Sequence, residues 1–287
     1  MPNLDQFKKN GKFLMLAFDH RGSFKKLMNP ENPDSVTAEE EIALKKEIIE
    51  TVYSEMSSVL IDDELGLPAL KQLFESGKEP KPYLMPLEKS GYEQQGKERL
   101  TTLEKTASEI KGLGATGAKL LLFFNPYAKS AEKQIEIAKK AWEDCQANNL
   151  PLFLEPRTYN DQGLEADKME DGEREQFAIE SLKKLVNAGI LPDVYKLEYP
   201  GTALACQTYS AVLEDRDLPW IMLTMGASFE DFTKQLEEAS IRGCQGFLAG
   251  RALWQEACTL KGEEKEKFLK ETLPERFRII SEIISMK

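Results

Sequence analysis

One pattern recurs eight times along the chain: a short apolar run is followed by a longer stretch with the apolar spacing of an amphipathic helix. Apolar runs this short are typical of buried strands, and strands that alternate with helices pair in parallel. The expected strands are residues 12–19, 58–64, 82–88, 117–126, 150–158, 193–201, 218–227 and 244–252. Eight such units predict an α/β fold, a (β/α)8 TIM barrel whose sheet closes on itself.

No linker and no shift in composition separates the eight units, so we expect residues 1–287 to form one domain. A charged stretch, residues 263–285, predicts an extra C-terminal helix. Within the third unit, residues 99–114 are expected to be helical after a polar loop. A doubly wound sheet is the alternative fold, but it would usually carry a GxGxxG turn after the first strand, where this chain has DHRGS.

Composition argues against several classes of function. The net charge of −11 argues against binding to nucleic acid or to a membrane surface, so an anionic ligand would need a locally basic pocket. The chain has 1 histidine, His20, whereas catalytic zinc and iron sites generally use several, so we expect no metal. The 4 cysteines form no CxxC pair, and no apolar run is long enough for a signal peptide or a membrane span. We expect a cytoplasmic protein.

Charged residues gather at the C-terminal ends of the expected strands, where barrels place their active sites. Asp19, Glu155 and Lys196 each share a strand face with the apolar residue two positions earlier. If those faces point inward, the three side chains converge at one mouth. Any one of them alone is more often a solvated rim residue or half of an ion pair, but the set as a whole favours a catalytic site.

A lysine at such a mouth can act as a nucleophile. Desolvation and a neighbouring cation would lower the pKa of Lys196, and its free amine could attack a ketone to form an iminium. Lys119, in the fourth strand, either supplies that cation or neutralises a carboxylate. Glu155 is either a general base for a substrate hydroxyl or half of a structural salt bridge.

The turns after the seventh and eighth strands have the composition of an anion site. Gly226 and Ser228 lie in a small-residue turn that opens one helix, and Gly250 precedes Arg251 at the start of another. In phosphate-binding barrels, backbone N–H groups of these two loops hold the phosphate, and Arg251 would add a charged fork.

With these residues in place, the chain resembles the family of class I aldolases that contains tagatose 1,6-bisphosphate aldolase and sulfofructose-phosphate aldolase. It is also similar to the aldolase module that acts on 2-deoxy-5-keto-gluconate 6-phosphate. The resemblance extends from about Leu14 to Trp254 and is carried by LAFDHRGS, LIDDELGLPA, GAKLLLFFNP, LFLEPRTY, DVYKLEYP and GFLAGRALW. It implies a (β/α)8 fold and chemistry without a metal or cofactor.

The resemblance also implies roles for individual residues. Lys196 matches the family's Schiff-base lysine, and Lys119 and Glu155 match residues that polarise the substrate and transfer protons. Asp19 matches an acid that hydrogen-bonds substrate hydroxyls, and Arg251 matches a phosphate ligand.

The chain departs from the family at the positions expected to face the distal part of the substrate. The tagatose enzymes typically have glutamine where this chain has His20, and Arg157 stands where an apolar residue is expected. His20 and Arg157 are therefore candidate substrate ligands. Arg157 either contacts a second anionic group or forms an ion pair with Asp161.

We therefore expect a lyase, a Schiff-base aldolase that cleaves a phosphorylated ketose or keto-sugar acid to dihydroxyacetone phosphate and an aldehyde. One alternative is an isomerase or epimerase that uses the same phosphate site and moves protons between Asp19, Glu155 and Lys119. Another is a non-catalytic protein that senses a sugar phosphate. The expected partner is a small phosphorylated sugar, and the oligomeric state stays open, with a homo-oligomer among the options.

Overall fold

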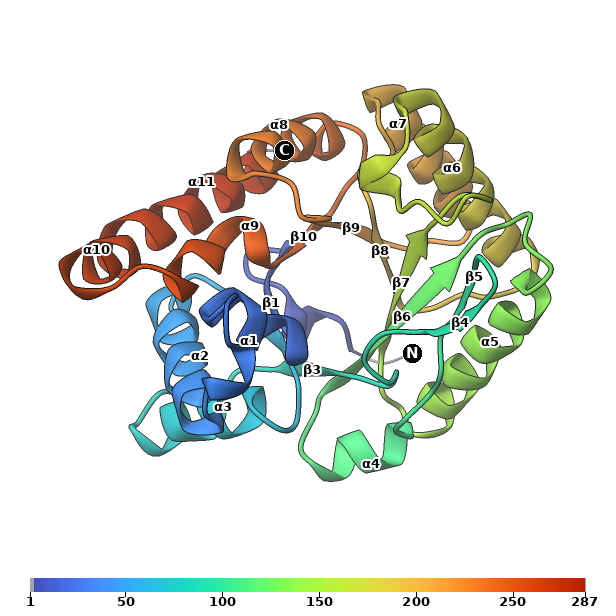
Figure 1. Cartoon of the computed structure of the whole chain (residues 1–287). Helices are drawn as coiled ribbons and strands as arrows, with labels where there is room; N and C mark the ends of the chain where they lie inside the picture. Colours follow the sequence, from blue (N-terminus) through green and yellow to red (C-terminus); the bar gives the residue numbers. More distant parts are fainter. Residues whose placement is uncertain (1–2, 287) are drawn as a thin grey trace.

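Eight parallel strands close into a barrel in the computed structural model, which describes residues 3–286 (Figure 1). The strands are β1 (Phe13–Phe18), β2 (Ser58–Ile61), β3 (Tyr83–Pro86), β6 (Gly117–Phe124), β7 (Leu152–Thr158), β8 (Val194–Leu197), β9 (Trp220–Leu223) and β10 (Gly246–Ala249). Neighbours in the barrel are also neighbours along the chain, and β1 pairs with β10 to close the ring. The predicted (β/α)8 barrel is confirmed.

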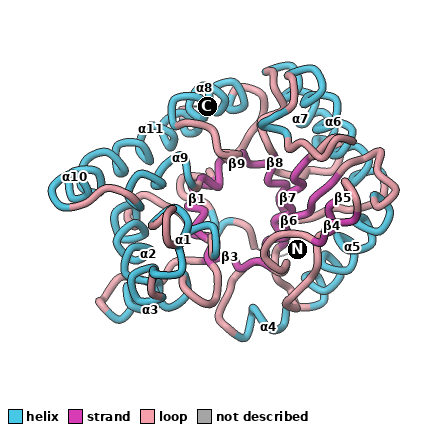
Figure 2. Tube along the Cα trace, in the orientation of Figure 1, coloured by secondary structure: helices cyan, strands magenta, loops and turns pink. Residues whose placement is uncertain are grey.

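Helices surround the ring of strands (Figure 2). They are α1 (Gly22–Met28), α2 (Ala38–Val52), α3 (Gly66–Glu75), α4 (Ala107–Gly112), α5 (Ala131–Ala147), α6 (Asp171–Asn187), α7 (Ala203–Glu214), α8 (Phe229–Ser240), α9 (Arg251–Trp254), α10 (Gly262–Lys267) and α11 (Leu273–Ser285). The extra C-terminal helix consists of α10 and α11, joined by a π-helical turn over Phe268–Thr272. None of the helices in residues 3–286 has the length and apolarity that a membrane crossing requires.

The barrel interior is apolar at one end and charged at the other. Phe13, Phe153 and Val194 are fully buried inside it, together with Phe7 from the segment that precedes β1. The ring of Phe7 packs edge-on against Phe153, with centroids 5.3 Å apart, so it covers the N-terminal end of the barrel. Residues an even number of positions further along these strands point the same way, and they include the charged Asp19, Glu155 and Lys196 of the other end.

The segment between β3 and β6 differs from expectation. Residues 99–114 do not form one helix: β4 (Glu93–Gln95) and β5 (Glu98–Leu100) make an antiparallel hairpin, and α4 begins only after Thr106. Thr106 caps α4 through its hydroxyl, which accepts a hydrogen bond from the Glu109 N–H. The Arg99 guanidinium stacks on the rings of Tyr92 and Tyr159, so tertiary contacts outweigh the local helical pattern.

Candidate active site

A cavity of about 270 Å³ opens at the C-terminal ends of the strands. Its wall is formed by residues that directly follow, or lie near the end of, β1, β3, β6, β7, β8, β9 and β10. All the residues expected at the site except Ser228 line it: Asp19, His20, Lys119, Glu155, Arg157, Lys196, Gly226, Gly250 and Arg251. The strand alternation therefore brings the predicted set into one space.

Lys196 and Glu155 form a buried ion pair on the cavity floor. Phe153 pairs with Val194 in the sheet, so the residues two positions further on lie beside each other with both side chains pointing inward. Lys196 Nζ donates to Glu155 Oε2 at 2.7 Å, and only 5% and 7% of the two side chains are exposed. A lysine held this way is already next to a group that can accept its proton.

Lys119 is surrounded by carboxylates. Its Nζ lies 2.6 Å from Glu88 Oε1, 3.0 Å from Asp19 Oδ2 and 3.6 Å from Glu155 Oε2. Burial works against the charged lysine, but the attraction of these three groups outweighs it and raises the pKa of Lys119 well above its usual range. Lys119 is therefore a fixed cation at the centre of the site.

The same attraction acts on the carboxylates. Burial alone would raise the pKa of Asp19, but Lys119 holds it far below its usual range. Burial opposes ionisation of Glu155 as well, and the two lysines, Lys196 first, lower its pKa. Both groups are carboxylates at neutral pH, so they can accept protons or hydrogen bonds from a substrate.

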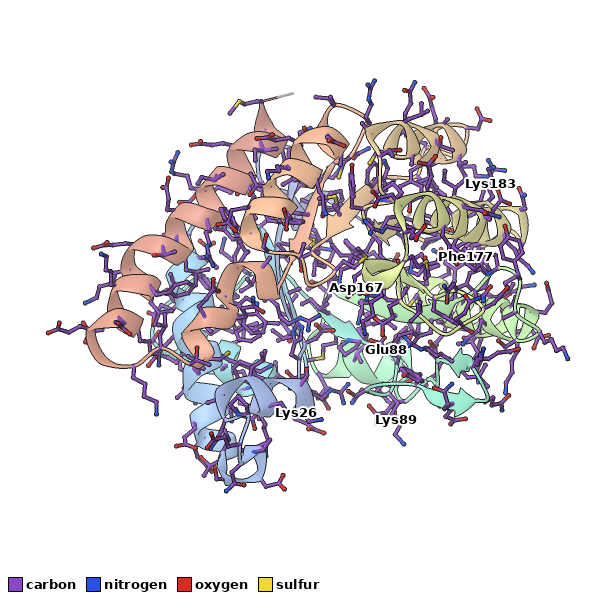
Figure 3. The ribbon with its side chains drawn as sticks, turned by 45° about the horizontal axis from the view of Figure 1, so that its top comes forward. Lys26, Glu88, Lys89, Asp167, Phe177 and Lys183 are labelled. Carbon is purple, nitrogen blue, oxygen red and sulfur yellow. The ribbon has the colours of Figure 1, made fainter. Side chains whose placement is uncertain are left out.

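Glu88 is one of the charged residues at the ends of the expected strands, but the sequence assigned it no role at the site. It accepts hydrogen bonds from Lys119 Nζ at 2.6 Å and from the Leu121 N–H at 3.0 Å. Figure 3 shows Glu88 within the barrel and the exposed Lys89 at its rim. The signal that could have found it is strand alternation, because Glu88 lies two residues beyond Pro86, which also lines the cavity.

Arg157 is paired on two sides, and neither partner is Asp161. Its Nε lies 3.0 Å from Glu198 Oε1, and its Nη2 donates to Glu165 Oε2 at 2.8 Å. The alternative that Arg157 pairs with Asp161 is wrong, and the Asp161 carboxylate accepts a hydrogen bond from Asn125 instead. Glu198 is therefore a buried counter-charge for Arg157.

His20 and Arg251 stand at another part of the wall. The His20 imidazole packs edge-on against Trp254, and its Nδ1 lies 4.0 Å from Asp19 Oδ1. Desolvation outweighs the attraction of Asp19 and lowers the pKa of His20 to about 4, so the imidazole is neutral at physiological pH. Within residues 3–286, no carboxylate lies within ion-pair distance of Arg251. Its guanidinium is thus free for an anionic ligand.

The turns beside Arg251 favour glycine for two different reasons. Gly226 has a φ of +80°, a backbone conformation that strains other residues, although a Cβ built on it would make only an ordinary contact 3.6 Å from Arg251 Nη2. A Cβ on Gly250 would lie 3.3 Å from the Ala17 carbonyl oxygen. Ser228 faces elsewhere: its hydroxyl accepts a hydrogen bond from the Asp231 N–H at 3.0 Å and caps α8, so the structure does not bring it into the cavity.

Behind the wall, Lys45 fixes the strand end that carries Asp19 and His20. This fully buried lysine of α2 donates to the carbonyl oxygens of Phe18 and His20, each at 2.8 Å, and to Asp62 Oδ1 at 2.6 Å. In the described part of the chain, no cluster of three or more histidine, cysteine or acidic side chains could hold a metal ion. The groups available for chemistry are lysines, carboxylates, arginines and one neutral imidazole.

Residues 13–256 match the sequence model of the DeoC/LacD family of aldolases. Tagatose 1,6-diphosphate aldolase of Staphylococcus epidermidis is 32% identical over 290 residues, which cover 90% of this chain and 85% of the relative. The enzyme of the same name from Lactococcus lactis subsp. lactis is 30% identical over an alignment that covers 92% of this chain and 87% of that enzyme.

Two solved structures are similar in fold. An archaeal fructose 1,6-bisphosphate aldolase aligns with a TM-score of 0.64 at 17% identity, covering 99% of each chain. The fructose-bisphosphate aldolase of Plasmodium falciparum aligns with a TM-score of 0.74 at 15% identity, covering 98% of this chain and 92% of that one.

Proposed function

The chain belongs to the DeoC/LacD family of aldolases, and on that premise we propose that it is a class I aldolase, a lyase that works through a Schiff base. Its substrate would be a phosphorylated ketose or keto-sugar acid, cleaved to dihydroxyacetone phosphate and an aldehyde. Tagatose 1,6-bisphosphate, after the relatives' name, is the first candidate, and a sulfofructose 1-phosphate is the second. The observation that carries the proposal is the contact of 2.7 Å between Lys196 Nζ and Glu155 inside the cavity.

The first step is formation of the iminium. Lys196 passes one proton to Glu155, and its amine nitrogen bonds to the ketone carbon as the carbonyl π bond breaks. A second proton then moves from that nitrogen to the alkoxide oxygen, which gives a neutral carbinolamine. Glu155 returns the proton to the carbinolamine hydroxyl, which leaves as water. One carboxylate thus serves as acid and base in turn, which is consistent with its position against the nucleophile.

The second step is cleavage of the carbon–carbon bond. Glu155, again a carboxylate, takes the proton of the hydroxyl on the carbon that becomes the aldehyde, across the bond that breaks from the iminium-bearing part. The electron pair of that bond flows into the iminium and gives an enamine, while the hydroxyl-bearing carbon leaves as the aldehyde. Protonation of the enamine and hydrolysis of the iminium release dihydroxyacetone phosphate and restore Lys196.

Lys119, Asp19 and Arg251 complete the proposed site. Lys119 keeps its charge through the cycle, so it can stabilise oxygen atoms that gain negative charge. The ionised Asp19 can accept hydrogen bonds from substrate hydroxyls. Arg251, which has no carboxylate partner among residues 3–286, would bind the phosphate together with backbone N–H groups of the turns at Gly226 and Gly250. We also propose a cytoplasmic location, which its 4 free, buried cysteines support.

The test is to trap the Schiff base. Borohydride added in the presence of dihydroxyacetone phosphate should reduce the iminium and fix the triose phosphate on Lys196, seen as a mass increase on the peptide that contains it. Lys196→Met should abolish the adduct. Lys26→Met, on an exposed lysine of α1 at the outside of the barrel (Figure 3), should leave it unchanged.

A coupled dehydrogenase assay for triose phosphate would then rank a panel of ketose phosphates, sulfonated analogues and keto-deoxy acids. The proposal fails if the enzyme releases triose phosphate while Lys196 carries no adduct. It also fails if every phosphorylated substrate is isomerised without release of a triose.

A further inference from the structure

Four charged side chains of alternating sign form a connected row, and two of them, Arg157 and Glu165, line the cavity. Arg99 Nη1 lies 2.6 Å from Glu165 Oε1, and the other oxygen of Glu165 lies 2.8 Å from Arg157 Nη2. Arg157 in turn lies 3.0 Å from Glu198. The Glu165 carboxylate therefore bridges two guanidinium groups, one of which, Arg157, lines the cavity beside it.

The two arginines are held in place without Glu165. Arg99 Nη2 donates to the Gly163 carbonyl oxygen at 2.8 Å, and its guanidinium lies over the rings of Tyr92, Phe123 and Tyr159. Arg157 is held by the buried Glu198, which also accepts a hydrogen bond from the Thr158 N–H. Both guanidiniums would therefore keep their positions if the Glu165 side chain turned away.

Glu165 is the exposed member of the set. Its side chain is 30% exposed, compared with 11% for Arg99, 12% for Arg157 and 2% for Glu198. A carboxylate on the cavity surface can rotate into solvent, whereas a buried one cannot leave without a large desolvation cost to its partners. When Glu165 leaves, two cations and one anion remain, and this part of the wall becomes positive.

We infer that Arg99 and Arg157 form a binding subsite for a second anionic group of the substrate, and that the Glu165 carboxylate occupies this subsite until the substrate displaces it. The inference rests on the proposed function and specifies its substrate class: a ketose 1-phosphate with a phosphate, sulfonate or carboxylate at its far end. The incoming oxyanion takes over the bridge between two planar guanidiniums, a geometry that suits all three groups.

The barrel order fits a substrate held at both ends. Arg157 lies on β7 and Arg251 follows β10, with β8 and β9 between them. Lys196 lies on β8, so the nucleophile is between the two anion sites along the wall. A ketose 1-phosphate with a neutral far end would leave Glu165 in place and gain nothing from Arg99.

The test compares a ketohexose 1-phosphate with the matching 1,6-bisphosphate. Glu165→Gln removes the competing charge while keeping the shape, so the KM for the bisphosphate should fall by roughly three- to tenfold with little change in kcat. Arg99→Met should raise that KM by roughly tenfold or more, because a charged hydrogen-bond donor is lost. For the monophosphate, both variants should keep the wild-type KM within about twofold.

Sulfonate and carboxylate analogues of the 1,6-bisphosphate identify the group that the subsite prefers. The preferred group should show the largest change in KM in both variants. The inference is overturned if Glu165→Gln changes the KM for the monophosphate and the bisphosphate equally, or raises it for the bisphosphate. Borohydride trapping with dihydroxyacetone phosphate, which lacks the far end, separates the two proposals. If trapping fails in the wild type, the Schiff-base function falls, and if it succeeds without the KM contrast, only the subsite falls.

Discussion

At the residue scale, His20 offers a direct measurement of the cavity's polarity. Its imidazole lies between the Asp19 carboxylate, which favours protonation, and the Arg251 guanidinium, which opposes it. Desolvation is the largest influence, and the pKa of His20 falls from 6.5 to about 4. Because the chain has 1 histidine, the imidazole signals in an NMR spectrum need no assignment.

We expect those imidazole signals to titrate with a midpoint near pH 4. The same shift predicts a loss of stability with acid, because the unfolded chain takes up the proton near pH 6.5 and the folded protein does not until about pH 4. The free energy of unfolding of the wild type, measured against His20→Gln, should therefore fall by about 3 kcal/mol between pH 7 and pH 4. A midpoint near 6.5, or a difference that is independent of pH, would show that the imidazole is fully hydrated.

At the scale of elements, the ion pair of Lys45 and Asp62 joins α2 to the ends of β1 and β2. Lys45 fixes two backbone carbonyls of the segment that carries Asp19, and Asp62 also accepts hydrogen bonds from the N–H groups of Leu65 and Gly66 at the start of α3. A helix outside the barrel thereby sets the position of Asp19, a carboxylate that lines the cavity inside it.

Lys45→Met should lower the free energy of unfolding by about 3–5 kcal/mol, because it leaves the buried Asp62 without its cation. The double variant Lys45→Met with Asp62→Asn should regain part of that loss, since asparagine is neutral and can still accept the N–H hydrogen bonds. Lys46→Met, which breaks only a surface pair with Glu50, should change the free energy of unfolding by less than about 1 kcal/mol. Urea unfolding of the four proteins gives the comparison, and a Lys45→Met protein as stable as the wild type contradicts it.

The elements also show where sequence reasoning succeeds and where it stops. The strands were predictable because a buried parallel strand needs a continuous apolar run, and alternation then predicts which charged residues point inward, such as Glu155 and Lys196. The β4–β5 hairpin was not predictable, because Arg99 is held there by aromatic rings distant in sequence. The partners of Arg157 were missed for the same reason: nearness in sequence favoured Asp161, whereas folding brings in Glu198 from the next strand.

At the scale of the whole molecule, the closure of the barrel also completes the cavity. Trp254 Nε1 donates to the Ala17 carbonyl oxygen at 3.2 Å, and its ring stacks on Phe18 with centroids 4.4 Å apart. The end of the chain's last barrel unit is thereby fastened to the first strand. This contact brings Arg251, three residues earlier, to the same cavity as His20.

Trp254→Ala should lower the free energy of unfolding by about 3–5 kcal/mol, as expected for a large aromatic side chain removed from a core. It should also raise the KM for a phosphorylated substrate, because α9 and Arg251 lose their attachment to β1. Trp254→Phe keeps the stacking and loses one hydrogen bond, so its cost should be about 1 kcal/mol. Urea unfolding and steady-state kinetics measure both effects, and equal losses in the two variants would contradict the assigned role of the ring.

The covering of the barrel's N-terminal end by Phe7, Phe13 and Phe153 affects how substrate enters and how products leave the enzyme. Among the described residues, these rings close the N-terminal end, and the cavity lies at the C-terminal ends of the strands, so we expect substrate and products to pass through the same mouth. On the proposed chemistry, the triose stays tethered to Lys196 at the floor while the aldehyde is already free. Departure is therefore ordered, with the aldehyde first, and in the direction of synthesis the triose phosphate has to enter first.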